Sequence, residues 1–252
     1  MDLGLNERVY VVTGATRGLG LATARALLAD GARVVVSGRT EDAVSRAAAE
    51  LGEGAVGVAA DNADADAPQR LIAAAREHFG RFDGMLVSVG GPPPGTAATN
   101  TDEQWRDAFE SVFLGAVRLA RTAAAELGEG GAIALVLSGS VRQPIGNLTI
   151  SNGLRPGLAG FAKSLSDEVG PRGVRVVGLL PGRIATDRMQ QLDAASGDPE
   201  RARARNEAAI PLGRYGDPEE FGRVAAFLLS PAAGYVNGVM VPVDGGAGRS
   251  VS

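Results

Sequence analysis

The sequence has no cysteine in 252 residues, a single lysine, a single histidine, and aromatic side chains at only 4% of its positions. The absence of cysteine excludes disulfides, zinc-thiolate sites and thiol nucleophiles, and it suits a reducing compartment. No apolar run approaches the roughly 20 residues that a membrane-spanning helix needs. Residues 1–8 also lack the basic-then-apolar form of a signal peptide. We therefore expect a soluble, cytoplasmic protein.

An excess of positive charge is absent as well. The formal net charge is -4, and arginines are interspersed with acidic residues along the chain. Such a surface has no basic field that would attract phosphate polymers, which argues against nucleic acid and anionic membranes as partners. A small-molecule ligand is the better expectation, and we expect no metal site.

Aliphatic runs and 36 glycines are abundant instead. Seven short runs predict strands at residues 9–13, 33–37, 55–59, 84–89, 132–138, 174–180 and 239–243, all buried on both faces. Apolar side chains at helical spacing lie between them, as in residues 105–119 and 158–169. This alternation predicts a parallel sheet, because parallel neighbours need a crossover connection. The expected fold is α/β: a single Rossmann-like domain over residues 1–252, with a doubly wound parallel sheet of about seven strands and helices on both faces.

One segment breaks this alternation. Residues 183–214 are polar and charged, with few large apolar side chains. In a doubly wound fold, an insertion beside the strand ends usually covers the ligand crevice, so we interpret this segment as a substrate lid. A solvated surface excursion is the alternative, and composition does not distinguish the two.

The strongest motif is the glycine-rich turn of residues 13–20, which reads Thr-Gly-Ala-Thr-Arg-Gly-Leu-Gly. Glycines there permit a tight turn, let the backbone approach a pyrophosphate, and let helix and strand pack closely. The N-terminus of the following helix faces the phosphate charge. Because the turn lies between a buried strand and an amphipathic helix, it predicts binding of a nicotinamide dinucleotide rather than a purely structural turn.

The second predicted strand ends without the acid that NAD-binding proteins carry. A carboxylate for the ribose 2′-hydroxyl should lie about 20 residues beyond the glycines, but residues 37–40 read Ser-Gly-Arg-Thr. Arg39 and Arg17 together form a cationic cradle suited to a 2′-phosphate, so we predict NADP(H). Two solvated surface arginines are the alternative.

These motifs resemble those of the short-chain dehydrogenase/reductase family, in particular its 3-oxoacyl-(acyl carrier protein) reductase-like members. Residues 13–20 match the family's Thr-Gly-x-x-x-Gly-x-Gly, residues 181–186 its Pro-Gly-x-x-x-Thr segment, and residues 243–246 its C-terminal signature. The resemblance implies a homodimer or homotetramer built through helices at about 102–127 and 151–169. The cofactor-binding residues predicted from the turn and from the resemblance are Gly14, Thr16, Arg17, Gly18, Leu19, Gly20, Arg39, Asp61, Asn62, Gly90, Arg155, Pro181, Gly182, Ile184 and Thr186.

The catalytic positions depart from the family pattern of a serine, a helical asparagine and a Tyr-x-x-x-Lys pair. Ser138 matches the serine, but Ser151, Arg155 and Val112 stand at the tyrosine, lysine and asparagine positions. No Tyr-x-x-x-Lys occurs anywhere, since the single lysine is Lys163. A serine hydroxyl is far less acidic than a phenol, and arginine stays protonated. This pair can therefore donate hydrogen bonds, but it is a poor general acid.

Two functions remain open. The first is an NADP(H)-dependent oxidoreductase acting on a carbonyl or alcohol, in which Ser138 and Ser151 bind the oxygen and water or substrate delivers the proton. Arg155 would anchor the ribose and polarise the site. The second is a non-catalytic NADP(H)-binding protein, either a cofactor sensor or a silent subunit of a mixed oligomer. Ser151 and Asn152 can also be interpreted as a helix N-cap, and Pro156 can shift the helix start away from the family register.

Overall fold

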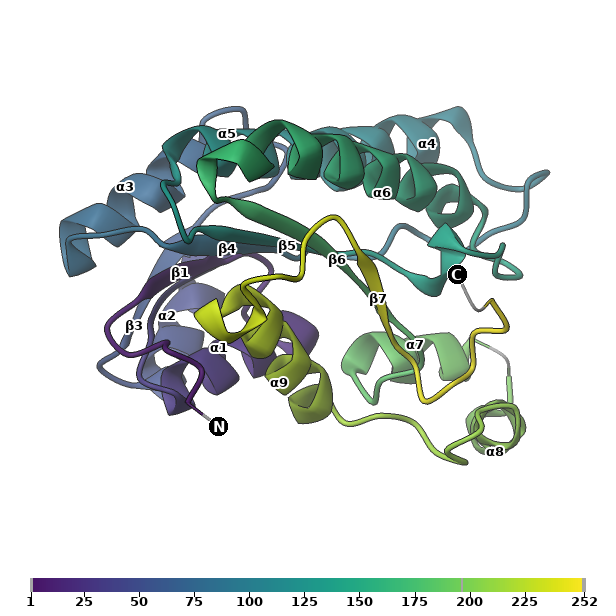
Figure 1. Cartoon of the computed structure of the whole chain (residues 1–252). Coiled ribbons are helices and arrows are strands. Elements are labelled where there is room, and N and C mark those ends of the chain that lie inside the picture. Colours follow the sequence, from purple (N-terminus) through teal and green to yellow (C-terminus); the bar gives the residue numbers. More distant parts are fainter. Residues whose placement is uncertain (1, 196, 251–252) are drawn as a thin grey trace.

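Within the described residues, seven parallel strands form one sheet in the order β3-β2-β1-β4-β5-β6-β7 (Figure 1). The computed structural model describes residues 2–195 and 197–250. All predicted strands are present, with bounds that differ from the prediction by no more than two residues, and the predicted fold class is confirmed. The strands are β1 (Val9–Val12), β2 (Arg33–Gly38), β3 (Ala55–Ala59), β4 (Gly84–Val87), β5 (Ala132–Val136), β6 (Arg175–Pro181) and β7 (Met240–Val243).

Helices cover both faces of the sheet (Figure 1). One face carries α3 (Ala67–Phe79), α4 (Asp102–Ala108), α5 (Gly115–Glu126) and α6 (Thr149–Val169), and the other carries α1 (Gly18–Ala29), α2 (Glu41–Leu51) and α9 (Pro218–Leu229). Two further helices, α7 (Asp187–Ala194) and α8 (Pro199–Ala208), follow β6. The strand order reverses at β1, which pairs with both β2 and β4. Ligands of doubly wound folds bind beside this reversal, at the carboxyl ends of the strands.

The core lies on both sides of the central strands. Along β1, Val9 and Val11 belong to the apolar cluster under α3, α5 and α6, whereas Tyr10 and Val12 belong to the cluster under α1 and α9. Strands β3 and β7 are only half-buried. The expectation that every strand is buried on both faces is therefore wrong for these two, because an edge strand has a neighbour on one side only.

The helix predicted from residues 105–119 contains an irregular turn. The π-helical turn η1 (Phe109–Leu114) separates α4 from α5. Turns of this kind occur mostly as single-turn bulges in α-helices, frequently at functional sites. The sequence predicted a helix here but gave no sign of the bulge.

Helix α6 begins earlier than its proline indicated. Its first residue is Thr149, and Pro156 lies inside the helix. The N-cap interpretation of Ser151 and Asn152 is therefore wrong, and the Asn152 amide instead exchanges two hydrogen bonds of 2.9 Å with the main chain of Ile145. Because the helix is continuous from Thr149, Ser151 and Arg155 lie one helical turn apart on the side of α6 that faces the cleft.

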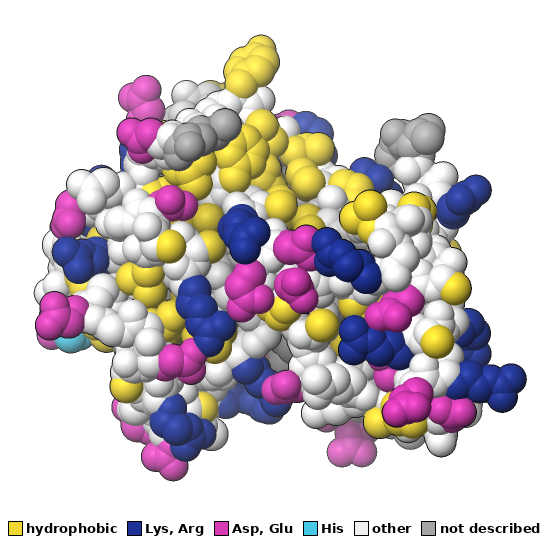
Figure 2. Space-filling model, turned by 90° about the horizontal axis from the view of Figure 1, so that it is seen from below, with side chains coloured by type: hydrophobic (Ala, Val, Ile, Leu, Met, Phe, Trp, Pro, Cys, Tyr) yellow, Lys and Arg dark blue, Asp and Glu magenta, His cyan; other side chains and the backbone are white. Residues whose placement is uncertain are grey.

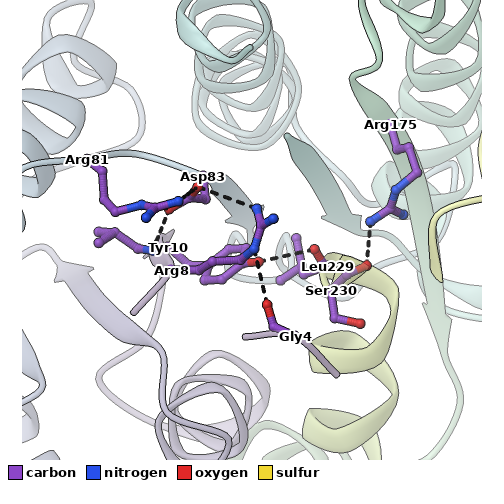
Figure 3. Close-up of polar contacts among 9 residues, drawn as sticks. Gly4, Arg8, Tyr10, Arg81, Asp83, Arg175, Leu229 and Ser230 are labelled. Atoms are coloured by element: carbon purple, nitrogen blue, oxygen red, sulfur yellow. Dashed lines mark hydrogen bonds and ion pairs between the residues drawn. The ribbon is translucent and has the colours of Figure 1, made fainter. Parts of the chain in front are cut away.

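A group of polar contacts lies at the amino ends of strands β1, β4 and β6 (Figure 3). The Asp83 carboxylate accepts two hydrogen bonds of 2.7 Å from Arg81 and pairs with Arg8 at 3.5 Å. The buried Arg175 donates to the main-chain oxygen of Ser230 at 2.9 Å, just beyond the end of α9. Its positive charge therefore faces the negative end of that helix dipole.

The surface on the side of α1, α2 and α9 carries basic and acidic side chains intermixed (Figure 2). Hydrophobic side chains gather toward one edge of this view. Across residues 2–195 and 197–250, no helix has the length and hydropathy of a membrane span.

Candidate active site

The glycine turn between β1 and α1 has the backbone that its sequence predicts. Gly14 and Gly18 have φ angles of +58° and +57°, a region that strains residues with a Cβ. A Cβ on Gly20 would lie 2.5 Å from the main-chain oxygen of Gly14, so close packing also requires glycine there. Arg17 occupies the N-cap of α1 and provides no side-chain cap. The first main-chain N–H groups of α1 lack intrahelical partners, as in any helix, and no N-cap side chain binds them, so they are suited to an anion.

One cleft of about 1200 Å³ runs along the carboxyl ends of the strands. It begins at the glycine turn, passes the loops after β4, β5 and β6, and is bounded by α7 and α8. All of the predicted site residues line it: Gly14, Thr16, Arg17, Gly18, Leu19, Gly20, Arg39, Asp61, Asn62, Gly90, Ser138, Ser151, Arg155, Pro181, Gly182, Ile184 and Thr186. The fold thus brings together residues that are more than half the chain apart.

The end of the cleft beside β2 is cationic. Arg39 is exposed, and its guanidinium makes no hydrogen bond or ion pair with the described residues. Arg17 lies 3.7 Å from the Asp187 carboxylate, and both side chains are mostly exposed, so this pair holds Arg17 weakly. The Asp61 carboxylate accepts a hydrogen bond of 3.0 Å from the main chain of Ala63, which also gives it a turn-forming role.

Three serines meet where the loop after β5 approaches α6. The main-chain N–H of Ser140 donates to Ser138 Oγ at 3.1 Å. Ser140 Oγ lies 3.1 Å from Ser151 Oγ, and both of these side chains are buried. Ser140 was not predicted from the sequence, because only the folded chain shows that it contacts both Ser138 and Ser151.

Arg155 lies one helical turn beyond Ser151 and is 4% exposed. Its guanidinium donates to the main-chain oxygens of Val136, at 2.6 Å, and Val89, at 3.5 Å. It has no carboxylate partner among residues 2–195 and 197–250. Burial lowers the pKa of Arg155 to about 10, which leaves it cationic at neutral pH. The cleft therefore contains a buried positive charge that the described part of the protein does not neutralise.

The position of the family's helical asparagine is apolar. Val112 lies in the π-helical turn and packs with Ala108, Ile150 and Leu154 in a small hydrophobic cluster. The turn brings the backbone of Gly115 so close to the main-chain oxygen of Asn62 that a Cβ would overlap with it. The π-helical turn thus lies close to the loop after β3, but Val112 has no side-chain group that could donate or accept a hydrogen bond in a proton relay.

Helix α7 spans the cleft opposite these residues. Thr186 caps the helix by accepting a hydrogen bond from the main chain of Met189 at 3.4 Å. Arg188, in the first turn, donates to the main-chain oxygen of Pro92 at 2.8 Å, and burial lowers its pKa. Arg188 also lines the cleft and, like Ser140, was not predicted from the sequence. Its side chain connects α7 to the loop after β4.

A polar cluster holds α7, α8 and the chain that follows them together. The Tyr215 hydroxyl donates to the Asp193 carboxylate, at 2.9 and 3.0 Å from its two oxygens. Asn206 donates to Asp193 at 3.2 Å and to the Tyr215 hydroxyl at 3.1 Å. Residues 183–214 supply part of the cleft wall, whereas their role as a substrate lid stays a prediction.

Comparisons with known proteins agree with this geometry. A short-chain dehydrogenase/reductase family model described as enoyl-(acyl carrier protein) reductase matches residues 14–248. An uncharacterized oxidoreductase of Methylorubrum extorquens is 33% identical over 246 residues, which cover 96% of this chain and 98% of that protein. The 3-oxoacyl-[acyl-carrier-protein] reductase FabG of Vibrio cholerae is 30% identical over 246 residues, covering 97% and 98%. L-rhamnose 1-dehydrogenase (NAD(P)(+)) of Azotobacter vinelandii is 35% identical over 252 residues, covering 96% and 97%.

Solved structures give the same result. A variant of actinorhodin polyketide ketoreductase with NADPH superposes with a TM-score of 0.90 at 30% identity, covering 96% of this chain and 98% of that one. L-sorbose reductase from Gluconobacter frateurii, complexed with NADPH and L-sorbose, superposes with a TM-score of 0.91 at 30% identity, covering both chains fully, at 100%. This chain belongs to the short-chain dehydrogenase/reductase family. The family predicted from the sequence motifs is confirmed.

Proposed function

We propose that this protein is an NADP(H)-dependent oxidoreductase that acts on a carbonyl or alcohol substrate through a non-standard catalytic centre. The observation that carries the proposal is the single cleft that joins the glycine turn to Ser138, Ser151 and Arg155. The relatives support the reaction class, because they are named reductases and dehydrogenases. The NADPH complexes among the similar structures support the choice of cofactor.

The residues of the cleft fit a phosphorylated dinucleotide. A Cβ on Gly14 would lie 2.6 Å from the main-chain oxygen of Ser88, so the glycine turn can pack this closely against the end of β4 only with glycine there. Glycines of such a turn also let the backbone approach a pyrophosphate. The guanidinium of Arg39 is without an ion pair in the described part of the chain, and that of Arg17 is held weakly. Both are therefore available for charge-assisted hydrogen bonds to a 2′-phosphate. Asp61 would contact the adenine side, and residues 181–186 the nicotinamide side.

The cofactor, when bound, supplies or accepts the hydride. Ser138 and Ser151 hold the substrate oxygen by hydrogen bonds, and Arg155 keeps a positive charge near the position where negative charge develops. Neither a serine hydroxyl nor a guanidinium releases its proton readily. Water in the open cleft, or the substrate itself, therefore delivers the proton. Losing a positioned acid typically costs roughly 10²- to 10⁴-fold in rate, so we expect slow turnover.

NADPH absorbance tests this proposal directly. Purified protein is mixed with NADPH and a panel of ketones, aldehydes, quinones and 3-oxoacyl thioesters, with an active family member run in parallel to show that the panel works. We expect slow oxidation of NADPH that depends on one class of substrate. Tight NADPH binding without substrate-dependent oxidation over the whole panel would instead support the non-catalytic cofactor-binding protein.

The cofactor preference gives a second prediction. Replacing Arg17 and Arg39 by alanine together should weaken NADPH binding by at least about tenfold, because charged hydrogen bonds are worth about 1.5 to 3 kcal/mol each. NADH binding should hardly change. Equilibrium titration of both cofactors measures the effect, and Arg46→Ala, an exposed residue of α2 outside the cleft, serves as the control. Tighter binding of NADH than NADPH by the unaltered protein would refute the role given to the two arginines.

A further inference from the structure

Ser140 lies between the two serines that we assign to the substrate oxygen. It is 3% exposed, and its main-chain N–H donates to Ser138 Oγ at 3.1 Å. Its hydroxyl lies 3.1 Å from Ser151 Oγ and 3.4 Å from the main-chain oxygen of Ser151. One buried residue therefore contacts both hydroxyl groups, once through its backbone and once through its side chain.

These contacts limit where the hydroxyl protons can point. A serine hydroxyl has one proton to donate and two lone pairs to accept with. Ser138 Oγ accepts from Ser140, and its own proton has no acceptor among the described residues, so that proton is available to the cleft. The hydroxyl proton of Ser140 has two acceptors, Ser151 Oγ at 3.1 Å and the more distant main-chain oxygen of Ser151 at 3.4 Å. When Ser140 donates to the nearer one, Ser151 Oγ, the Ser151 proton becomes available in the same way.

Arg155 adds donors of the same kind. A guanidinium has five N–H groups and no lone pair, and those of Arg155 reach only the main-chain oxygens of Val136 and Val89 within the described structure. Its charge is buried without a carboxylate beside it, which is unfavourable unless a ligand compensates it. Ser138, Ser151 and Arg155 thus together offer the cleft more hydrogen-bond donors than acceptors.

We propose that Ser140 is a positioning residue that directs the hydroxyl protons of Ser138 and Ser151 into the cleft. The centre then binds an oxygen that carries no proton, in a carbonyl group or a carboxylate, in preference to the hydroxyl of an alcohol. This inference rests on the proposed function for the location of the substrate oxygen. It adds a ligand class, because a carbonyl oxygen, which only accepts hydrogen bonds, is bound more tightly than the hydroxyl of the alcohol.

A matched pair of small probes tests the inference without turnover. Acetate and ethanol are similar in size but differ in carboxylate against hydroxyl, and both can be titrated into the cofactor-free protein. Dissociation constants and the NMR signal of the Arg155 Nε–H group are the readouts. We expect acetate to shift this signal and to bind at least about tenfold more tightly than ethanol, the ratio expected for one charge-assisted hydrogen bond.

Variants separate positioning from general structural effects. Ser140→Ala removes the side-chain contact to Ser151 but keeps the main-chain contact to Ser138, so acetate binding should weaken about tenfold while ethanol binding changes little. Ser140→Thr, which keeps the hydroxyl, should restore acetate binding. Ser164→Ala is the control, because Ser164 is exposed on α6 outside the cleft and donates only to the main-chain oxygen of Gly160.

The outcomes distinguish this inference from the proposed function. Equal affinity for acetate and ethanol, an unmoved Arg155 signal, or unchanged acetate binding in Ser140→Ala would each overturn the inference. Substrate-dependent oxidation of NADPH would still support the proposed function in that case. Conversely, selective acetate binding supports the inference even where no substrate of the panel is turned over.

Discussion

At the residue scale, Arg155 is the clearest departure from an ordinary core position. Its guanidinium is 4% exposed and has main-chain oxygens as its hydrogen-bond partners. Burial lowers its pKa from the ordinary arginine range to about 10. A base whose pKa is lower in the folded than in the unfolded state does not lower the free energy of unfolding at a pH above its unfolded-state pKa. The free energy of unfolding falls as the pH is lowered, and the full loss is present below the folded-state pKa of about 10. At neutral pH the protein therefore carries the full cost of this charge.

Replacing Arg155 by methionine should reveal that cost. Methionine fills much of the same volume without a charge, so the free energy of unfolding at neutral pH should stay constant or rise by on the order of 1 kcal/mol. The affinity for acetate should fall by at least about tenfold, because the cation is gone. Chemical denaturation and the acetate titration measure the two effects.

Arg175→Met is the matched control for this substitution. Arg175 is also a buried arginine that donates to main-chain oxygens, but it lies at the amino ends of the strands and faces the end of α9. Its replacement should lower stability and leave acetate binding unchanged. A loss of several kcal/mol in Arg155→Met, with acetate affinity intact, would show that Arg155 is structural.

At the element scale, α6 shows which features of a helix a sequence pattern predicts and which it does not. The spacing of Leu158, Ala162 and Leu165 predicts a helix, and these residues are buried as expected. The family resemblance implied a start near residue 151, within two residues of Thr149, but the local pattern opposed it, because an interior proline is locally unfavourable by about 3 kcal/mol. Packing of the first turn overrides this preference, since Ile150 is fully buried. Such tertiary stabilisation is not visible in a local pattern.

The loops and the π-helical turn were harder to predict than the strands. The contact between Ser140 and Ser151 depends on β5 and α6 meeting, which no spacing within the chain encodes. In the π-helical turn, Val112 likewise packs against Ile150 and Leu154, residues that lie far along the chain. By contrast, the glycine turn is a local feature, because the positive φ angles of Gly14 and Gly18 depend on the residue type itself.

The register of α6 leads to a prediction about restoring the family's tyrosine and lysine at positions 151 and 155. Ser151 and Arg155 lie one turn apart and line the same cleft as Ser138, so Ser151→Tyr combined with Arg155→Lys should place an acidic phenol beside an ammonium. We expect kcat to rise by about 10²-fold in the double variant. Arg155→Lys alone, which adds no phenol, should give no such gain. Steady-state rates that stay the same in the double variant would show that the site lies elsewhere in the cleft.

At the scale of the whole molecule, the architecture was predictable because each strand and helix has its own periodicity. The parallel direction of the strands then follows from the crossovers, and the position of the ligand cleft follows from the strand ends, whereas the strand order was not predicted. The intermixed charges in Figure 2 match the composition and leave small molecules as the expected partners. Assembly as a homodimer or homotetramer through the α4, α5 and α6 region, and a cytoplasmic location, stay predictions.

The central claim is that this cleft transfers hydride between NADP(H) and a substrate although it lacks the Tyr-x-x-x-Lys pair. The most direct measurement uses NADPH deuterated at the transferable position of C4, with products of the substrate panel analysed by mass spectrometry. We expect deuterium on the former carbonyl carbon of one product class, at a slow rate. Tightly bound deuterated NADPH that never labels a product, while an active family member labels its own in the same panel, would contradict it.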